Sequence, residues 1–213
     1  MVFVSFYALW RTGRGEWSRW GYLVAGLFAG LTVAAEYTGA LGLIPLAAYG
    51  LWSAPGGRRG RIQAAALGIL GVLPVALLLG WYHHAAFGSP LATGYKYLND
   101  AGYQGWHVGG FLGIRLPDPR AFVLSFFSPL RGLFALSPFL IFALPGFAPR
   151  FWSREHRGEL ALCAAVLALY TYFTSSFSYD SWGWTTGPRH LTSLVPFLLL
   201  PAGLFLQAAR ANL

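Results

Sequence analysis

The most constraining feature of the chain is an apolar run, residues 62–82, that follows a cluster of arginines and ends in aromatic residues. Such a run is long enough for a helix to cross the roughly 30 Å hydrocarbon core of a bilayer. Composition agrees, because 56% of the residues are hydrophobic and 10% are charged, whereas about a quarter of the residues in a soluble domain are charged. We therefore predict an integral membrane protein.

Basic residues occur mainly in short stretches between apolar segments. Of the 15, all but Lys96 are arginines, and they give a formal net charge of +8. Nucleic-acid binding would need them clustered on one soluble face, so no nucleic-acid partner is expected. Ten lie at 11–19, 58–61, 150–157 and 210, which the positive-inside rule places in the cytoplasm. The other five are predicted outside: Lys96, Arg115, Arg120, Arg131 and Arg189.

The stretch 22–52 is apolar and has arginines beyond both ends, so both ends are predicted on the cytoplasmic side. About 31 residues do not provide two full spans at 1.5 Å per residue. We predict two short helices that reverse near residues 36–39, in a turn surrounded by protein or a wet cavity. Glu36 is the only carboxylate in this stretch. It is either a functional group or a residue that reaches the interface or pairs with an arginine.

Further crossings are predicted at 122–147, 160–174 and 191–207. Cys163 stands alone in one of them and is predicted to be a buried structural thiol. Residues 1–10 are too short to span and have their arginines after them, unlike a signal peptide. We interpret them as the end of a helix entering the cytoplasm, with a further portion upstream, or as a short interfacial helix.

The predicted fold is all-α: a polytopic transmembrane helix bundle with short re-entrant or hairpin helices and external aromatic loops. It forms a single transmembrane domain over residues 1–213, with external loops at about 83–121 and 175–190. Adjacent His83 and His84 cannot point the same way on a helix, so interfacial packing is predicted there and no metal site. The first loop can stack on sugar rings, lie on the membrane or simply pack on the surface, through Tyr95, Lys96, Tyr97, Asn99 and Asp100.

Two further places bring charge next to apolar segments. Arg131 follows Pro129, which predicts a helix start or break near the outer interface; its guanidinium either snorkels or binds a phosphate through two hydrogen bonds. The second loop, YDSWGWTTGPRH, lies between two apolar segments, where its polar groups could hold a charged head group. Its candidate residues are Tyr179, Asp180, Trp182, Trp184, Arg189 and His190.

Two motifs, FFSPLRGLFALSPFLIFALPG (126–146) and WGWTTGPRHLTSLVPFLLLPAG (182–203), are preceded by YHHAAFGSPLATGY. Together they resemble the C-terminal half of bacterial multi-pass glycosyltransferases of the GT-C superfamily. The resemblance covers essentially the whole chain and points to family 39, which includes protein O-mannosyltransferase and aminoarabinose-transferase relatives. It implies location in the bacterial plasma (inner) membrane. It also implies inverting transfer of a sugar from a polyprenyl-phosphate carrier to a glycan, lipid or protein acceptor on the extracytoplasmic side.

Inverting transfer needs a carboxylate that deprotonates the acceptor and a cation that stabilises the departing phosphate. Arg131 and Arg189 suit the second role, with Lys96 as a third candidate. The resembled enzymes carry their catalytic acid in a first external loop that has no counterpart here, which leaves Glu36 and Asp180 as candidates for the base. The remaining candidate substrate contacts are His190, Tyr95, Tyr179, Trp182 and Trp184.

No cofactor is predicted, and a role for a divalent metal stays open. Two other functions fit the composition. One is a non-catalytic multi-pass membrane scaffold. The other is a transporter or flippase-like protein, which is disfavoured because 62–82 and 160–174 contain no internal charge.

Overall fold

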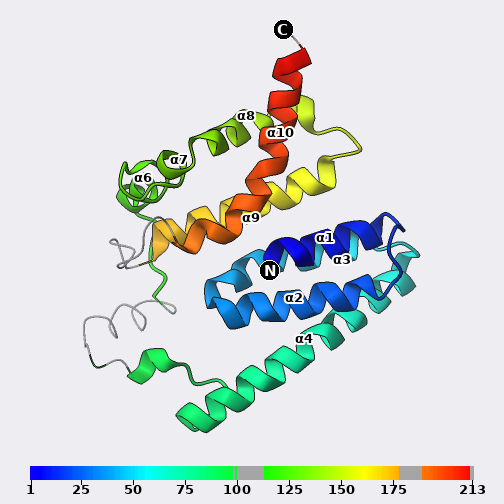
Figure 1. Ribbon diagram of the computed structural model, residues 1–213, viewed down its shortest axis with the longest axis vertical. Coiled ribbons are helices and arrows are strands. Elements are labelled where there is room, and N and C mark those ends of the chain that lie inside the picture. Colours follow the sequence, from blue (N-terminus) through cyan, green and yellow to red (C-terminus); the bar gives the residue numbers. More distant parts are fainter. Residues whose placement is uncertain (98, 100–112, 178–188, 212–213) are drawn as a thin grey trace. The chain divides into compact units, whose positions relative to one another are not determined.

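The computed structural model describes residues 1–97, 99, 113–177 and 189–211 (Figure 1). Over those residues it is helical, with one isolated bridge between Ile114 and Phe177 and no strand. Three helices are long and apolar enough to cross a membrane: Gly57–Phe87, Arg157–Ser176 and Arg189–Ala211. The predicted all-helical class is confirmed, and the three helices suggest a membrane protein. The polytopic arrangement and the sidedness of the loops stay predictions.

The chain separates into two compact units, Met1–Leu98 and Asn99–Leu213. Each unit is described by itself below. The single transmembrane domain over residues 1–213 stays a prediction.

The first unit contains four helices: α1 (Val2–Gly13), α2 (Gly21–Ala35), α3 (Ala40–Ser53) and α4 (Gly57–Phe87). Neighbours in sequence run in opposite directions. The Ser5 hydroxyl on α1 donates a 2.8 Å hydrogen bond to the carbonyl oxygen of Ala25 on α2. The rings of Phe6 on α1 and Tyr49 on α3 lie 5.8 Å apart. Both contacts help to close the interior of this unit.

Glycines bring α2 and α4 together. Gly26 and Gly30 form a GxxxG motif on α2, and Gly71 lies opposite on α4. A Cβ atom on Gly26 would overlap the backbone of Gly68, and one on Gly71 would overlap the carbonyl oxygen of Leu23. The two backbones therefore touch, as at the small-residue interfaces of membrane helices. The prediction from sequence did not include this motif.

The two short helices predicted around residues 36–39 are present, and their arrangement in a membrane stays a prediction. Helix α2 ends at Ala35, the short 3₁₀ turn η1 (Tyr37–Gly39) follows, and α3 returns from Ala40. Glu36 joins the two in an extended conformation. At 15 and 14 residues, the helices are roughly 21–23 Å long, shorter than the hydrocarbon core of about 30 Å.

Helix α4 extends the predicted run 62–82 at both ends. It begins next to Gly56 and ends before Gly88, both in the left-handed conformation that glycine adopts without strain. The N–H group of Gly88 bonds to the carbonyl oxygen of His84 and closes the last turn. With 31 residues, α4 is roughly 46 Å long.

The second unit begins with a broken helical segment. The apolar run 122–147 is not a single helix, and α6 ends just before Pro129, where the sequence predicts a helix start or break; that this run crosses the membrane stays a prediction. Prolines at 129, 138 and 145 cannot donate the backbone hydrogen bonds that a continuous helix needs. The pieces are α6 (Pro119–Phe127), α7 (Leu133–Leu136), η3 (Pro138–Phe142) and α8 (Ala143–Gly146), followed by η4 (Pro149–Phe151).

Two longer helices complete the second unit. Helix α9 (Arg157–Ser176) and the pair η5 (Arg189–Leu194) and α10 (Val195–Ala211) match the predicted crossings 160–174 and 191–207. Gly146 of α8 packs so closely on α10 that a Cβ there would overlap the Pro201 carbonyl oxygen. Cys163 is buried, as predicted.

Candidate functional site

A polar contact joins the hairpin turn of the first unit to the end of α4. The Tyr37 hydroxyl lies 2.9 Å from Nε2 of His83, and Nδ1 of His83 lies 3.3 Å from the carbonyl oxygen of Pro90. A carbonyl only accepts, so Nδ1 is the donor in the contact with Pro90, and in the neutral tautomer with that proton Nε2 accepts from the Tyr37 hydroxyl. His83 is only 5% exposed, and each of its ring nitrogens has a hydrogen-bond partner.

Aromatic rings surround this contact. The ring of Tyr95 lies 6.2 Å from that of Tyr37, and Tyr97 stacks on Phe87 at 5.3 Å. The Tyr97 hydroxyl also donates to the Phe87 carbonyl oxygen at 3.2 Å. The segment η2 (Gly94–Tyr97) therefore packs against the hairpin turn and the end of α4 within the first unit.

His83 and His84 diverge as predicted, since His84 is exposed. His83 packs against aromatic rings. Lys96 lies within η2, and its proposed contact with a substrate stays a prediction. Asn99 is exposed, and Asp100 lies outside the described residues.

Replacing Tyr37 with phenylalanine is expected to destabilise the first unit by about 1–3 kcal/mol, because Nε2 of the buried His83 loses its partner. The matched control is Tyr82→Phe, one residue from His83, where the side chain is 54% exposed. Thermal unfolding of both purified variants in detergent tests the contact. Equal midpoints for the two variants would contradict it.

In the second unit, a short strap crosses the end of α9. The backbone N–H of Arg115 donates to the Ser176 carbonyl oxygen, and that of Asp118 donates to the Ser175 carbonyl oxygen, both at 2.7 Å. Asp118 also begins α6, since its side chain accepts from the N–H of Arg120 at 2.8 Å. These bonds fix residues 114–118 against the last turn of α9.

His190 lies at the same end of α9. Its ring is 5.8 Å from that of Phe173 and 6.4 Å from that of Phe177. Arg189, which is exposed, precedes it at the start of η5. Arg189 and His190 therefore lie at the start of the candidate span Arg189–Ala211, and the His190 ring lies next to the end of the candidate span Arg157–Ser176.

Buried hydroxyl groups line this part of the second unit. Thr174 and Ser175 donate to the Thr171 carbonyl oxygen, at 3.2 and 2.7 Å. The hydroxyl oxygens of Ser125 and Ser176 are buried without a hydrogen-bond partner within the part of the chain that the structure describes. A buried polar atom of this kind calls for an explanation such as a bound water or ligand.

The structure places the predicted site residues in both units. Glu36, half-buried, and Tyr95 belong to the first unit, and Arg131 and Arg189 belong to the second. Arg131 is half-buried in the turn after α6, where its N–H lies 3.3 Å from the Ser128 carbonyl oxygen. The remaining predicted residues lie outside the described part of the chain: Tyr179, Asp180, Trp182 and Trp184.

Comparisons with known proteins add no identification. No protein-family model matches the chain, and no curated protein or solved structure is significantly similar to it. Among the residues that the structure describes, no three histidine, cysteine, aspartate or glutamate side chains gather where they could hold a metal ion.

Sequence reasoning missed the contact between Tyr37 and His83 and the buried serines at the end of α9. Tyr37 was visible only as a neighbour of Glu36 in the predicted turn. In the sequence, the adjacent serines at 175 and 176 indicated only that an apolar helix has a polar end.

Proposed function

We propose that this chain is a glycosyltransferase domain of the bacterial plasma membrane that handles a sugar carried on a polyprenyl phosphate. The observation that supports it best is the placement of Arg189 and His190. They open the apolar segment Arg189–Ala211 next to the end of α9. A cationic group at the mouth of apolar helices suits a ligand with a charged head group and a hydrocarbon tail.

In the proposed reaction, an acceptor oxygen attacks the anomeric carbon of the sugar from the face opposite the phosphate. The bond between that carbon and the phosphate oxygen breaks, and its electron pair leaves with the phosphate. Arg189 binds the phosphate through two charge-assisted hydrogen bonds, which strengthen as negative charge develops there. Arg131 serves as a second cation.

A carboxylate takes the proton of the acceptor as the new bond forms. Of the two carboxylates named from the sequence, Asp180 belongs to the same unit as Arg189 and is assigned this role, whereas Glu36 belongs to the first unit. His190 is assigned to the head-group site because Phe173 and Phe177 hold its ring beside Arg189. The buried Ser176 hydroxyl, at the same end of α9, provides a further donor.

The test is binding of a polyprenyl phosphate to the purified protein, with the corresponding polyprenol as the uncharged control ligand. Arg189→Ala is expected to raise the Kd at least about tenfold, because hydrogen bonds to charged groups contribute roughly 1.5–3 kcal/mol. Arg210→Ala, which removes a guanidinium from the opposite end of the segment Arg189–Ala211, is expected to leave the Kd within about twofold.

Two results would contradict the assignment. One is an unchanged Kd for the Arg189→Ala protein. The other is equal binding of the polyprenol and the polyprenyl phosphate by the wild-type protein. That result would favour a scaffold that binds the hydrocarbon chain and does not recognise the phosphate.

A further inference from the structure

Four helix ends meet at one end of the first unit. The last residue of α1, Gly13, is so close to α3 that a Cβ on it would lie 3.0 Å from the Ser53 hydroxyl oxygen. A Cβ on Gly21, the first residue of α2, would overlap the Thr12 hydroxyl. Helix α4 begins at Gly57, four residues after α3 ends. The hairpin turn with Tyr37 lies at the other end, next to His83.

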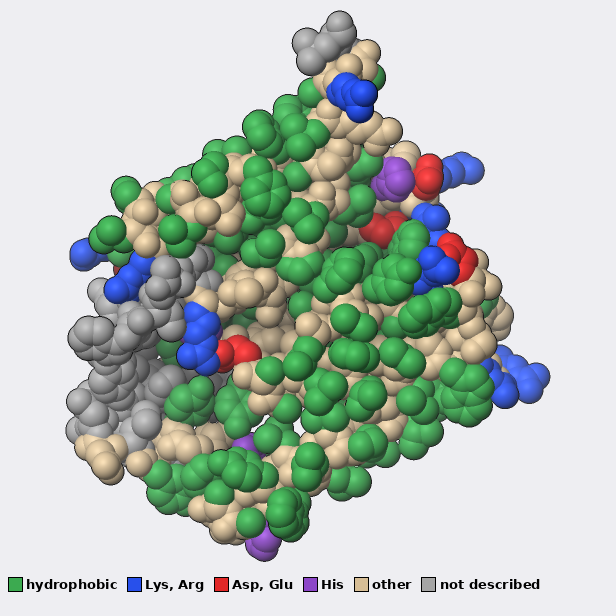
Figure 2. All heavy atoms as spheres, viewed as in Figure 1, with side chains coloured by type: hydrophobic (Ala, Val, Ile, Leu, Met, Phe, Trp, Pro, Cys, Tyr) green, Lys and Arg blue, Asp and Glu red, His purple; other side chains and the backbone are tan. Residues whose placement is uncertain are grey.

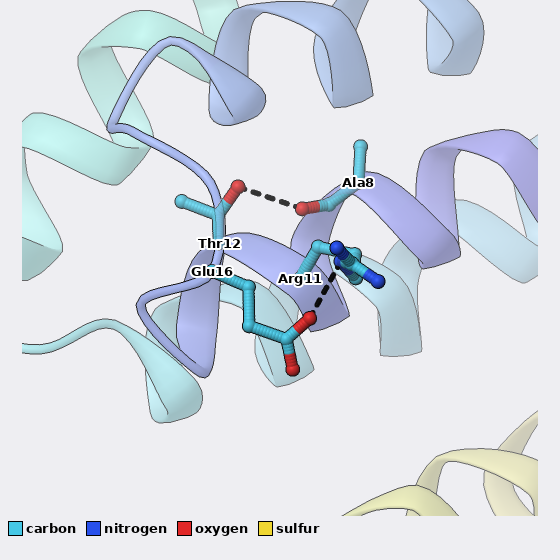
Figure 3. A network of polar contacts seen from close by, with 4 residues as sticks. All are labelled: Ala8, Arg11, Thr12 and Glu16. Carbon is cyan, nitrogen blue, oxygen red and sulfur yellow. Dashed lines mark hydrogen bonds and ion pairs between the residues drawn. The ribbon is translucent and has the colours of Figure 1, made fainter.

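This end, which we call the arginine end, is strongly basic. Among the described residues of these four helix ends and their connections there is one carboxylate, Glu16, which forms a 2.7 Å ion pair with Arg11 (Figure 3). In the same view, the Thr12 hydroxyl bonds to the Ala8 carbonyl oxygen and holds the last turn of α1. The arginine end is defined by six residues: Arg11, Arg14, Arg19, Arg58, Arg59 and Arg61.

Aromatic side chains accompany these arginines. The guanidinium of Arg14 lies 4.6 Å from the Trp10 ring centre, and that of Arg19 lies 5.8 Å from the Trp20 ring centre. Trp20 and Trp52 are both 57% exposed. Exposed tryptophans mixed with arginines are typical of protein surfaces at the head-group level of a bilayer.

Helix α4 places the arginine end at that level. Arg61 and Trp81 are twenty residues apart, or roughly 30 Å at 1.5 Å per residue, which equals the thickness of a hydrocarbon core. Between them α4 exposes large apolar side chains, including Ile69 at 63% and Leu77 at 69%. Figure 2 shows hydrophobic side chains on the surface over α4. Lipid chains can cover such a surface, with phosphate head groups at the arginine end.

We propose that the arginine end binds a leaflet rich in anionic phospholipids and prefers those lipids to zwitterionic ones. Six guanidinium groups against one carboxylate complement the negative surface of such a leaflet. Each exposed basic residue near an anionic surface contributes about 1 kcal/mol to its attraction. This inference rests on the candidate spans and the charges of the first unit, and not on the proposed transfer reaction.

The experiment measures energy transfer from tryptophan to dansyl-phosphatidylglycerol or dansyl-phosphatidylcholine, with the protein reconstituted in phosphatidylcholine vesicles. The ratio of the two association constants gives the lipid preference. Arg58→Gln/Arg59→Gln is compared with Arg115→Gln/Arg120→Gln, which changes the net charge equally at exposed positions of the second unit.

The wild-type protein should prefer the anionic lipid, and 0.5 M salt should reduce the preference by screening. In the Arg58→Gln/Arg59→Gln protein, the ratio of the two association constants should fall by up to about fivefold for each arginine removed. The control protein should retain the wild-type ratio. Inorganic phosphate at constant ionic strength should not compete. Competition by phosphate, equal ratios in the two double variants, or no preference in the wild type would overturn the proposal.

Discussion

Gly26→Ala is expected to disrupt the packing of α2 on α4 and to lower the free energy of unfolding by up to about 3 kcal/mol. The added methyl group would clash with the Gly68 backbone. Backbone atoms cannot relieve the clash by changing rotamer, as a flexible side chain can. Relief requires the two helices to separate. Separation would also loosen the contact between Tyr37 and His83, which depends on the same pair of helices.

The matched control is Gly68→Ala. This glycine lies on α4 in the same interface, yet a Cβ built on it has no atom within 4 Å. Its substitution is expected to leave the free energy of unfolding unchanged or to raise it by up to about 1 kcal/mol, because alanine favours a helix over glycine. Unfolding of the purified proteins in detergent, followed by circular dichroism, compares the two. Equal stabilities would show that the helices are not in backbone contact.

The helices of the first unit were predictable because the arginines mark where apolar segments begin and end. The absence of a basic residue from 22 to 52 and the short length available were enough to predict the hairpin around Glu36. What escaped prediction was how α2 and α4 pack. Gly26 and Gly30 lie within an apolar stretch, and a count of apolar residues does not distinguish a helix face that packs on another helix from one that faces lipid.

The second unit was less predictable because local breaks depend on more than hydropathy. The run 122–147 is apolar enough to cross a membrane, but its prolines divide it into short pieces. Pro129 was recognised as a break, whereas Pro138 and Pro145 were not. Where the broken segment lies in a bilayer depends on packing that no single-sequence pattern contains.

The candidate site was predictable as a set of residue types and not as an arrangement. Arg189 and His190 stood out because they interrupt apolar sequence. His190 and Phe173 are in contact although they are 17 residues apart in the sequence, and His83 and Tyr37 are in contact although they are 46 residues apart. Contacts of this range arise when helices pack, so sequence spacing does not reveal them.

The central claim is that the Arg189 end of the second unit faces the extracytoplasmic side. Its most direct test is labelling of single cysteines at opposite ends of α9 in a Cys163→Ala background. Leu116→Cys lies on the strap that is bonded to Ser176 and is 89% exposed. Ser153→Cys lies at the other end, where Ser153 is exposed and accepts from the N–H of Arg157 at 2.9 Å.

Helix α9 has 20 residues and is roughly 30 Å long, enough to separate its two ends across a hydrocarbon core. A membrane-impermeant maleimide added to intact spheroplasts is therefore expected to label Leu116→Cys almost completely. It should label Ser153→Cys only after the membrane is permeabilised. Labelling of Ser153→Cys and protection of Leu116→Cys in intact spheroplasts would contradict the account, because Arg189 would then face the cytoplasm.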